Sequence, residues 1–220
     1  MKLSKDDIRK AMLLYAVTDR MWLKEGQALA DVVEDVLQNG ATFLQIREKD
    51  LPADDFAAEA EKLCTLCRRY AVPFVVNDSV EIALQCAADG VHVGQSDIRG
   101  RDIRALIGPD RILGISAGTV EEAVAAEKAG ADYIGVGAVF ATSTKKNARN
   151  MTVEQLRRIA EAVSIPVVAI GGIGAQNISR LSGSGIDGVA VVSAIFGAED
   201  PGKATAALRN LSEEMVRGHG

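Results

Sequence analysis

The feature that most constrains the fold of this sequence is a repeated alternation of short β-branched runs, polar or glycine-rich loops, and longer stretches with helical spacing. Eight such units follow one another along the chain. The expected strands are Leu13–Thr18, Thr42–Arg47, Pro73–Asn77, Gly90–Val93, Ile112–Ser116, Tyr133–Val136, Val167–Ile170 and Gly188–Val192. The expected helices are Gln27–Asn39, Ala53–Tyr70, Val80–Ala87, Arg101–Ile107, Val120–Ala129, Val153–Ala162, Ala175–Ser182 and Gly202–Met215.

A strict alternation of strands and helices predicts a parallel sheet. Eight units in 220 residues favour closure into one (β/α)8 TIM barrel, a single domain over residues 1–220, rather than an open doubly wound sheet. Residues 1–12 are expected to form an N-terminal helical extension. In such barrels the chemistry lies in the loops that follow the carboxyl ends of the strands. Candidate functional residues are therefore expected at those ends.

Charge and composition restrict the classes of partner. Thirty acidic residues against 25 scattered basic ones give a net charge of -5, so nucleic acid is not an expected partner. The charged start, residues 1–10, lacks the apolar core of a secretory signal. The longest uncharged stretch, Ala162–Ser179, contains Pro166 and three glycines, so no membrane span is expected. We expect a cytoplasmic protein that acts on small molecules, and the sequence is compatible with a homo-oligomer.

Polar residues end the second expected strand. In an extended segment Gln45, Arg47 and Lys49 would share one side and project into the barrel mouth. Leu44 and Ile46 would then face the helices. Two cations and an amide in phase can hold a group with two or three negative charges through charge-assisted hydrogen bonds. The alternative is a solvated strand end with ordinary surface charges.

Two carboxylates follow neighbouring strands. Asp78 comes directly after the third strand, and Asp97 lies in the Gly94-Gln95-Ser96-Asp97 loop after the fourth. Adjacent strands of a barrel place such loops side by side, so the pair predicts two oxygen ligands for a Mg²⁺ ion that also takes pyrophosphate oxygens and water. Each aspartate alone could instead cap the following helix.

A second anion site is expected after the last two strands. Gly171 and Gly172 follow strand seven, and Val192 and Ser193 follow strand eight, with residues 194–197 suited to a short extra helix. Backbone N–H groups at this place form the phosphate site that recurs in these barrels. The loop after strand six is rich in hydroxyls and cations and could close over a ligand, or it could be an ordinary surface loop.

Two further patterns are interpreted as packing. Cys64 and Cys67 have Cys-x-x-Cys spacing but fall late in an expected helix, without a second pair, so we expect buried thiols and no disulfide. His92 lies among valines of the fourth strand and is expected in the interior. Only two histidines occur, which excludes a multi-histidine metal site.

Seven segments in order carry a resemblance to a known family. They are Tyr15–Asp19, Gln45–Lys49, Asn77–Asp78, Gly90–Asp97, Gly114–Ser116, Gly135–Lys145 and Ala169–Gly172. The resemblance as a whole spans about residue 14 to residue 196. In these segments the sequence resembles the thiamine-phosphate synthase family.

The resemblance implies a Mg²⁺-dependent transferase that joins a pyrimidine pyrophosphate to a thiazole phosphate and releases pyrophosphate. It places the pyrimidine pyrophosphate at Gln45, Arg47, Lys49, Asn77, Ser116 and Lys145, and it adds Ile46 and Glu48 as substrate-binding residues. It places the thiazole phosphate at Thr142, Ser143, Thr144, Gly172, Val192 and Ser193. It gives catalytic roles to Arg47, Lys49, Ser116 and Lys145, with Asp78 and Asp97 as the Mg²⁺ ligands.

Three other functions are compatible with the same barrel. A thiazole tautomerase-like isomerase would bind thiazole phosphate but would lack the diphosphate residues, which are present here as Arg47, Lys49, Asp78, Asp97 and Lys145. A non-catalytic thiamine-phosphate binder would be expected to carry an appended regulatory segment. A different phosphate-binding barrel isomerase would have no use for two acidic strand ends.

Overall fold

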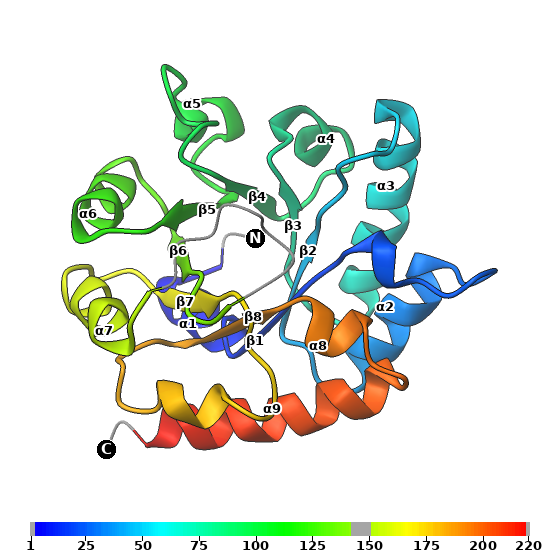
Figure 1. Ribbon diagram of the computed structural model, residues 1–220. Coiled ribbons are helices and arrows are strands. Elements are labelled where there is room, and N and C mark those ends of the chain that lie inside the picture. The colour runs from blue at the N-terminus through cyan, green and yellow to red at the C-terminus, as the bar shows by residue number, and fades with distance from the viewer. Residues whose placement is uncertain (1–2, 142–150, 219–220) are drawn as a thin grey trace.

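A computed structural model describes residues 3–141 and 151–218. Eight parallel strands close into a barrel in which each strand pairs with the next and β8 pairs with β1. Figure 1 shows the barrel along its axis, with the helices arranged around it. The strands are β1 Leu14–Val17, β2 Phe43–Ile46, β3 Phe74–Asn77, β4 Gly90–Val93, β5 Ile112–Ala117, β6 Tyr133–Gly137, β7 Val167–Ile170 and β8 Gly188–Val191. The predicted (β/α)8 fold is confirmed.

Helices connect the strands. The α-helices are α1 Lys5–Ala11, α2 Leu29–Gln38, α3 Ala53–Arg69, α4 Val80–Gln85, α5 Ile103–Ile107, α6 Val120–Lys128, α7 Val153–Glu161, α8 Ser193–Phe196 and α9 Pro201–Arg217. Two short 3-10 helices, η1 Arg20–Trp22 and η2 Ile178–Leu181, complete the described elements. Side chains fix several of the starts. For example, Thr152 and Gln155 form a capping box on α7, and Asp200 caps α9 just before Pro201.

One expected helix is wrong. The segment 175–182 forms only the 3-10 turn η2 and no α-helix. The side chain of Asn177 accepts a hydrogen bond from the backbone N–H of Gly174 and donates one to the carbonyl of Gly172. These local bonds compete with helix formation, and Gly183, at φ +75°, ends the segment. The chain therefore stays in a tight loop next to β7.

Side-chain alternation along the strands produces two cores. In β1, Tyr15 and Val17 point into the barrel, whereas Leu14 and Ala16 pack between the strands and the helices. The outer core contains most of the buried aliphatic residues, because the helices around the barrel, such as α2 and α3, pack their apolar stripes on the sheet. The inner core is small and contains aromatic rings, which leaves room for polar side chains at one end of the barrel.

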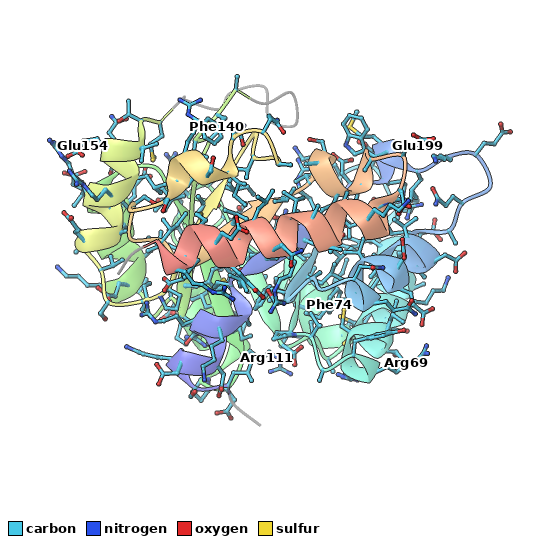
Figure 2. The ribbon with its side chains drawn as sticks, turned by 90° about the horizontal axis from the view of Figure 1, so that it is seen from below. Arg69, Phe74, Arg111, Phe140, Glu154 and Glu199 are labelled. Carbon is cyan, nitrogen blue, oxygen red and sulfur yellow. The ribbon has the colours of Figure 1, made fainter. Side chains whose placement is uncertain are left out.

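Helix α1 closes the other end. Ile8 and Met12 belong to the inner core together with Tyr15 and Phe43. Figure 2 shows α1 at the end of the barrel opposite the loops that carry Phe140 and Glu199. The carboxyl ends of the strands therefore form the open mouth. Within residues 3–141 and 151–218, no helix is both long and apolar enough to cross a membrane.

Candidate active site

The second strand delivers one of its three predicted side chains into the barrel. Gln45 is 5% exposed, points inward, and donates from Nε2 to the hydroxyl of Tyr15 at 2.5 Å. Ile46 is fully buried in the outer core, so only its backbone faces the mouth. The strand ends at Ile46, and the alternation that placed Gln45, Arg47 and Lys49 on one side therefore stops before Arg47.

Arg47 and Lys49 lie in the loop after β2. The backbone N–H of Arg47 donates to the hydroxyl of Thr18, and its guanidinium lies 3.8 Å from a carboxylate oxygen of Asp19. The side chain of Arg47 is 17% exposed, whereas Lys49 is exposed to solvent. The loop thus holds one cation at the mouth and leaves the other at its rim.

Glu48 belongs to an ion-pair cluster that the sequence did not predict. Its carboxylate lies 3.3 Å from the guanidinium of Arg20, which also contacts Glu59 at 3.4 Å. Burial raises the pKa of Glu48, and the bond from Arg20 opposes that shift. The cluster connects the loop after β2 to η1 and α3, and so it helps to fix the position of Arg47. Arg20 is 28 residues from Glu48 in sequence, and no local pattern signals the pairing.

The two predicted metal ligands lie close together. The backbone N–H of Asp78 donates to the carbonyl of His92, which holds the end of β3 beside β4. Asp97 accepts a hydrogen bond from the backbone N–H of Gly94 at 2.8 Å. Desolvation raises the pKa of Asp78, and so does the neighbouring Asp97 carboxylate, while the positive charge of Arg47 acts in the opposite direction. Arg47, Asp78 and Asp97 therefore share one electrostatic environment at the mouth.

These carboxylates suit a hard cation. Two adjacent negative oxygens that repel each other are the donor set that Mg²⁺ prefers, and a cation between them would relieve the repulsion. In the part of the chain that the structure describes, no group of three or more His, Cys, Asp or Glu side chains is placed to hold a metal. Asp78 and Asp97 together would supply two oxygen ligands, fewer than the six that Mg²⁺ takes.

Three further polar residues line the interior near the mouth. Asn77 ends β3 and pairs in register with His92, and His92 pairs with Gly114 of β5. The hydroxyl of Ser116 lies 2.9 Å from Nε2 of His92, and its carbonyl accepts a hydrogen bond from Gln95 at 2.7 Å. His92 is therefore an interior, hydrogen-bonded histidine, as expected from the sequence.

A recess lies beside the ends of β7 and β8. It has a volume of about 520 Å³. It is lined by Ala141, Gly172, Ile173, Ala175, Gln176, Ser193, Ala194, Gly197, Ala198, Ala204, Ala207 and Leu208. None of these described lining residues carries a charge. Val192 packs against the inner core next to it, and the short helix expected after β8 is present as α8.

Glycine shapes the wall of this recess. Gly172 has φ +65°, and a Cβ there would lie 2.3 Å from the carbonyl oxygen of Ala141. Only glycine fits that position without moving the backbone. The side chain of Asn177 bonds to both Gly172 and Gly174 and so fixes the loop. Asn177 was missed from the sequence, although an Asn three residues after a glycine turn is a typical local hydrogen-bonding signal.

The remaining predicted residues divide into two groups. Thr142, Ser143, Thr144 and Lys145 lie outside the described residues. Cys64 and Cys67 are buried free thiols of α3, which agrees with a packing role.

A closed eight-stranded barrel with cationic and acidic side chains at the carboxyl ends of its strands defines a (β/α)8-barrel enzyme. Comparison with known proteins narrows this class. Residues 14–195 match the family model described as thiamine monophosphate synthase. The chain belongs to this family.

Similar proteins agree along nearly the whole chain. The chain is 47% identical over 201 residues to a thiamine-phosphate synthase of Clostridioides difficile (strain 630), covering 91% of this chain and 95% of the relative. It is 50% identical over 187 residues to one of Ruminiclostridium cellulolyticum, covering 85% and 89%. A solved thiamine phosphate pyrophosphorylase from Pyrococcus furiosus superposes with a TM-score of 0.87 at 42% identity, covering 95% and 99%. The predicted family and transferase class are confirmed.

Proposed function

We propose that this protein is a thiamine-phosphate synthase. It would condense 4-amino-2-methyl-5-hydroxymethylpyrimidine pyrophosphate with 4-methyl-5-(2-phosphoethyl)thiazole, here called the thiazole phosphate, to give thiamine phosphate and pyrophosphate. The observation that best supports this reaction is that Asp78 lies beside Asp97 and within the electrostatic reach of Arg47. A barrel that only bound or isomerised a thiazole phosphate would not need a cation beside two acidic strand ends. The distinctive requirement of the condensation is stabilisation of a leaving diphosphate.

The diphosphate is proposed to bind at the β2 loop. The backbone of Arg47 is held by Thr18, and its guanidinium lies 3.8 Å from Asp19, so the cation is positioned after β2 where the diphosphate is proposed to bind. Lys49 is exposed at the rim and can approach the same anion. Lys145 is assigned to this site from the sequence alone. Three cations facing a departing anion would stabilise the charge that develops on it.

Asp78 and Asp97 are proposed to hold a Mg²⁺ ion. The family resemblance and the close approach of the two carboxylates support this assignment. When bound, the ion would neutralise charge on the diphosphate.

The pyrimidine ring is proposed to lie over the inner polar residues Gln45, Asn77 and Ser116. These side chains come from β2, β3 and β5, so their positions are fixed by strands rather than by loops. Rigid placement matters because the lone pair of the thiazole nitrogen has to point at the pyrimidine methylene carbon. Orientation of this kind can supply a large part of a rate enhancement.

The thiazole phosphate is proposed to bind in the recess at Gly172, Val192 and Ser193. The recess is lined by Gly172, in a glycine turn, and by Ser193, the first residue of α8, and a glycine turn and a helix start both suit phosphate oxygens. Its neutral lining admits the apolar thiazole ring. Thr142, Ser143 and Thr144 are assigned to the same ligand from the sequence.

The proposed bond changes are simple. The C–O bond between the pyrimidine methylene and the diphosphate breaks, and the bonding pair leaves with pyrophosphate. The lone pair of the thiazole nitrogen then forms the new C–N bond. No proton has to move in these steps, so the site needs no general base. The work of the protein is electrostatic and positional.

We further propose that residues 1–220 act as one barrel domain, with α1 as an extension that closes its amino-terminal end. We place the protein in the cytoplasm, acting on its small-molecule substrates as a monomer or homo-oligomer.

Mixing the protein with both substrates and Mg²⁺ tests the function. We expect a product with the mass of thiamine phosphate and one equivalent of pyrophosphate. Conversion of a thiazole isomer without pyrophosphate release would contradict the proposal and favour the tautomerase-like function. Binding of thiamine phosphate without any turnover would favour the non-catalytic binder.

A further inference from the structure

A chain of buried hydrogen bonds crosses the barrel interior. Gln45 donates to the hydroxyl of Tyr15, which lies 2.8 Å from the hydroxyl of Tyr133. The hydroxyl of Tyr133 lies 2.9 Å from Nδ1 of His92, and Nε2 of His92 lies 2.9 Å from the hydroxyl of Ser116. The chain connects two residues assigned to the pyrimidine, Gln45 and Ser116, through three residues to which no role has been given.

The sequence leaves space for His92. A Cβ on Gly114 would lie 2.5 Å from Nδ1 of His92 and 2.2 Å from a ring carbon of Tyr133. A Cβ on Gly135 would lie 3.1 Å from Cε1 of His92. Any larger residue at Gly114 would displace the imidazole or the phenol. The inward-facing glycines of β5 and β6 thus form a slot that fits a ring at this height in the barrel.

The order of donors along this chain of hydrogen bonds is inferred from the bond at Gln45. Burial raises the pKa of Tyr15 and of Tyr133, so both phenols keep their protons. Because Tyr15 accepts a hydrogen from Gln45, we assign its own hydrogen to Tyr133, the other hydroxyl within hydrogen-bond distance. The hydrogen of Tyr133 is then directed to Nδ1 of His92.

This order fixes the state of the imidazole. A neutral imidazole that accepts at Nδ1 carries its hydrogen on Nε2. The hydrogen on Nε2 of His92 is donated to the Ser116 oxygen. The hydroxyl hydrogen of Ser116 is consequently directed away from His92, toward the side on which Ser116 is partly exposed.

We propose that His92 is a positioning residue for the pyrimidine substrate, holding Ser116 so that its hydroxyl donates to a ring nitrogen of the pyrimidine. This inference rests on the proposed function of the site. At the other end of the hydrogen-bond chain, Gln45 commits one of its two N–H bonds to Tyr15 and keeps its second N–H and its carbonyl oxygen. The Ser116 hydroxyl as a donor and the Gln45 carbonyl oxygen as an acceptor match a ring nitrogen and the amino group of an aminopyrimidine.

Three substitutions of His92 separate its two bonds. In His92→Gln the amide nitrogen can take the place of Nε2 and still donate to Ser116. In His92→Asn the shorter amide reaches only the place of Nδ1, so it can bond to Tyr133 but not to Ser116. His92→Leu removes both bonds and fills a similar volume. Affinity for hydroxymethylpyrimidine pyrophosphate with Mg²⁺, and separately for the thiazole phosphate, is measured by calorimetric titration of each variant.

We expect His92→Gln to bind the pyrimidine substrate within about threefold of the wild type. His92→Asn and His92→Leu are expected to bind it about tenfold or more weakly, as for the loss of one oriented hydrogen bond. Affinity for the thiazole phosphate should not change in any variant. If the three variants lose affinity equally, or lose affinity for both ligands, His92 has only a structural role and the inference is overturned.

A second set of variants, made in the Ser116→Ala protein, tests whether His92 acts on the pyrimidine through Ser116. In Ser116→Ala there is no hydroxyl to hold, so adding His92→Leu should cause no further loss of pyrimidine affinity. An additional tenfold loss would overturn the inference. If His92→Leu does not fold, the order of His92→Gln and His92→Asn still decides. A wild type that binds both ligands but makes no thiamine phosphate would refute the proposed function, while the same order of affinities would still test the role of His92.

Discussion

The two regions of the barrel mouth that we propose to bind anions are built from different parts of the chain. At β2 to β4 the groups are charged side chains, with Arg47 beside the Asp78 and Asp97 carboxylates. At β7 and β8 the described wall of the recess is neutral, and its shape depends on Gly172 at φ +65°. The first region can respond strongly to the charge of a leaving group, whereas the second can only hold a phosphate in place. Chemistry is therefore expected at the first region and anchoring at the second.

The largest effect is expected from removing a cation of the first region. Arg47→Ala should lower kcat/KM for the pyrimidine substrate by on the order of 100-fold, because the loss is felt most when charge develops on the diphosphate. Arg69→Ala is a matched control, since Arg69 pairs with Glu34 and lies far from the rim that carries Phe140 (Figure 2). Steady-state kinetics with each substrate varied in turn provides the measurement. Equal losses in both variants would mean that Arg47 acts only through net charge.

The next effect concerns the two carboxylates. Asp78→Asn and Asp97→Asn should each raise the Mg²⁺ concentration for half-maximal activity by about tenfold, which is about 1.4 kcal/mol. The double variant should lose less than the sum of the two free energies, because both residues act on one ion. Asp110→Asn, an exposed aspartate just before β5, is the control. Full additivity, or undiminished activity in excess chelator, would rule out a metal ion shared by Asp78 and Asp97.

A smaller effect is expected in the second region. Gly172→Ala should weaken thiazole phosphate binding by about fivefold, roughly 1 kcal/mol, because the added Cβ meets the carbonyl of Ala141 and shifts the loop. Gly183→Ala has the same left-handed strain, at φ +75°, but its Cβ would meet nothing within 4 Å. Comparing the two by calorimetry separates loop displacement from backbone strain. Similar thiazole phosphate affinities would show that the shape of the Gly172 loop is not used in binding.

No effect on activity is expected from replacing a cysteine of the Cys-x-x-Cys pair. Cys67 is buried in the outer core, so Cys67→Ala should lower the free energy of unfolding by about 1 kcal/mol through lost packing. kcat and both KM values should stay the same. Chemical denaturation and kinetics on one preparation test this. A fall in kcat without a change in stability would show that the Cys-x-x-Cys pair has a chemical role.

The fold could be predicted because its signals are local. Each β-branched run and each helical stretch is visible within a short window, and their strict alternation leaves few topologies. The failure at 175–182 came from Asn177, whose side chain bonds to Gly172 and Gly174 in place of a helical turn. The sequence shows the residue but not the choice between these bonds and a helix.

The site was predicted as a set of residues but not as a set of contacts. Glu48 was expected with its neighbours at the substrate, yet its carboxylate pairs with Arg20, 28 residues earlier. The chain of bonds through His92 depends on Tyr15 and Tyr133, which are 118 residues apart and come from strands that are not neighbours. Such contacts arise from barrel closure, and no short sequence pattern encodes them.

The central claim is that two separate anion sites bind the two substrates, and Ser193→Asp tests it most directly. A carboxylate in the recess would repel the thiazole phosphate but would lie away from the Arg47 region. Calorimetric titration of each substrate separately into this variant provides the measurement. The account predicts a loss of thiazole phosphate affinity of tenfold or more, with little change for the pyrimidine pyrophosphate. Equal losses for both ligands would contradict the two-site arrangement.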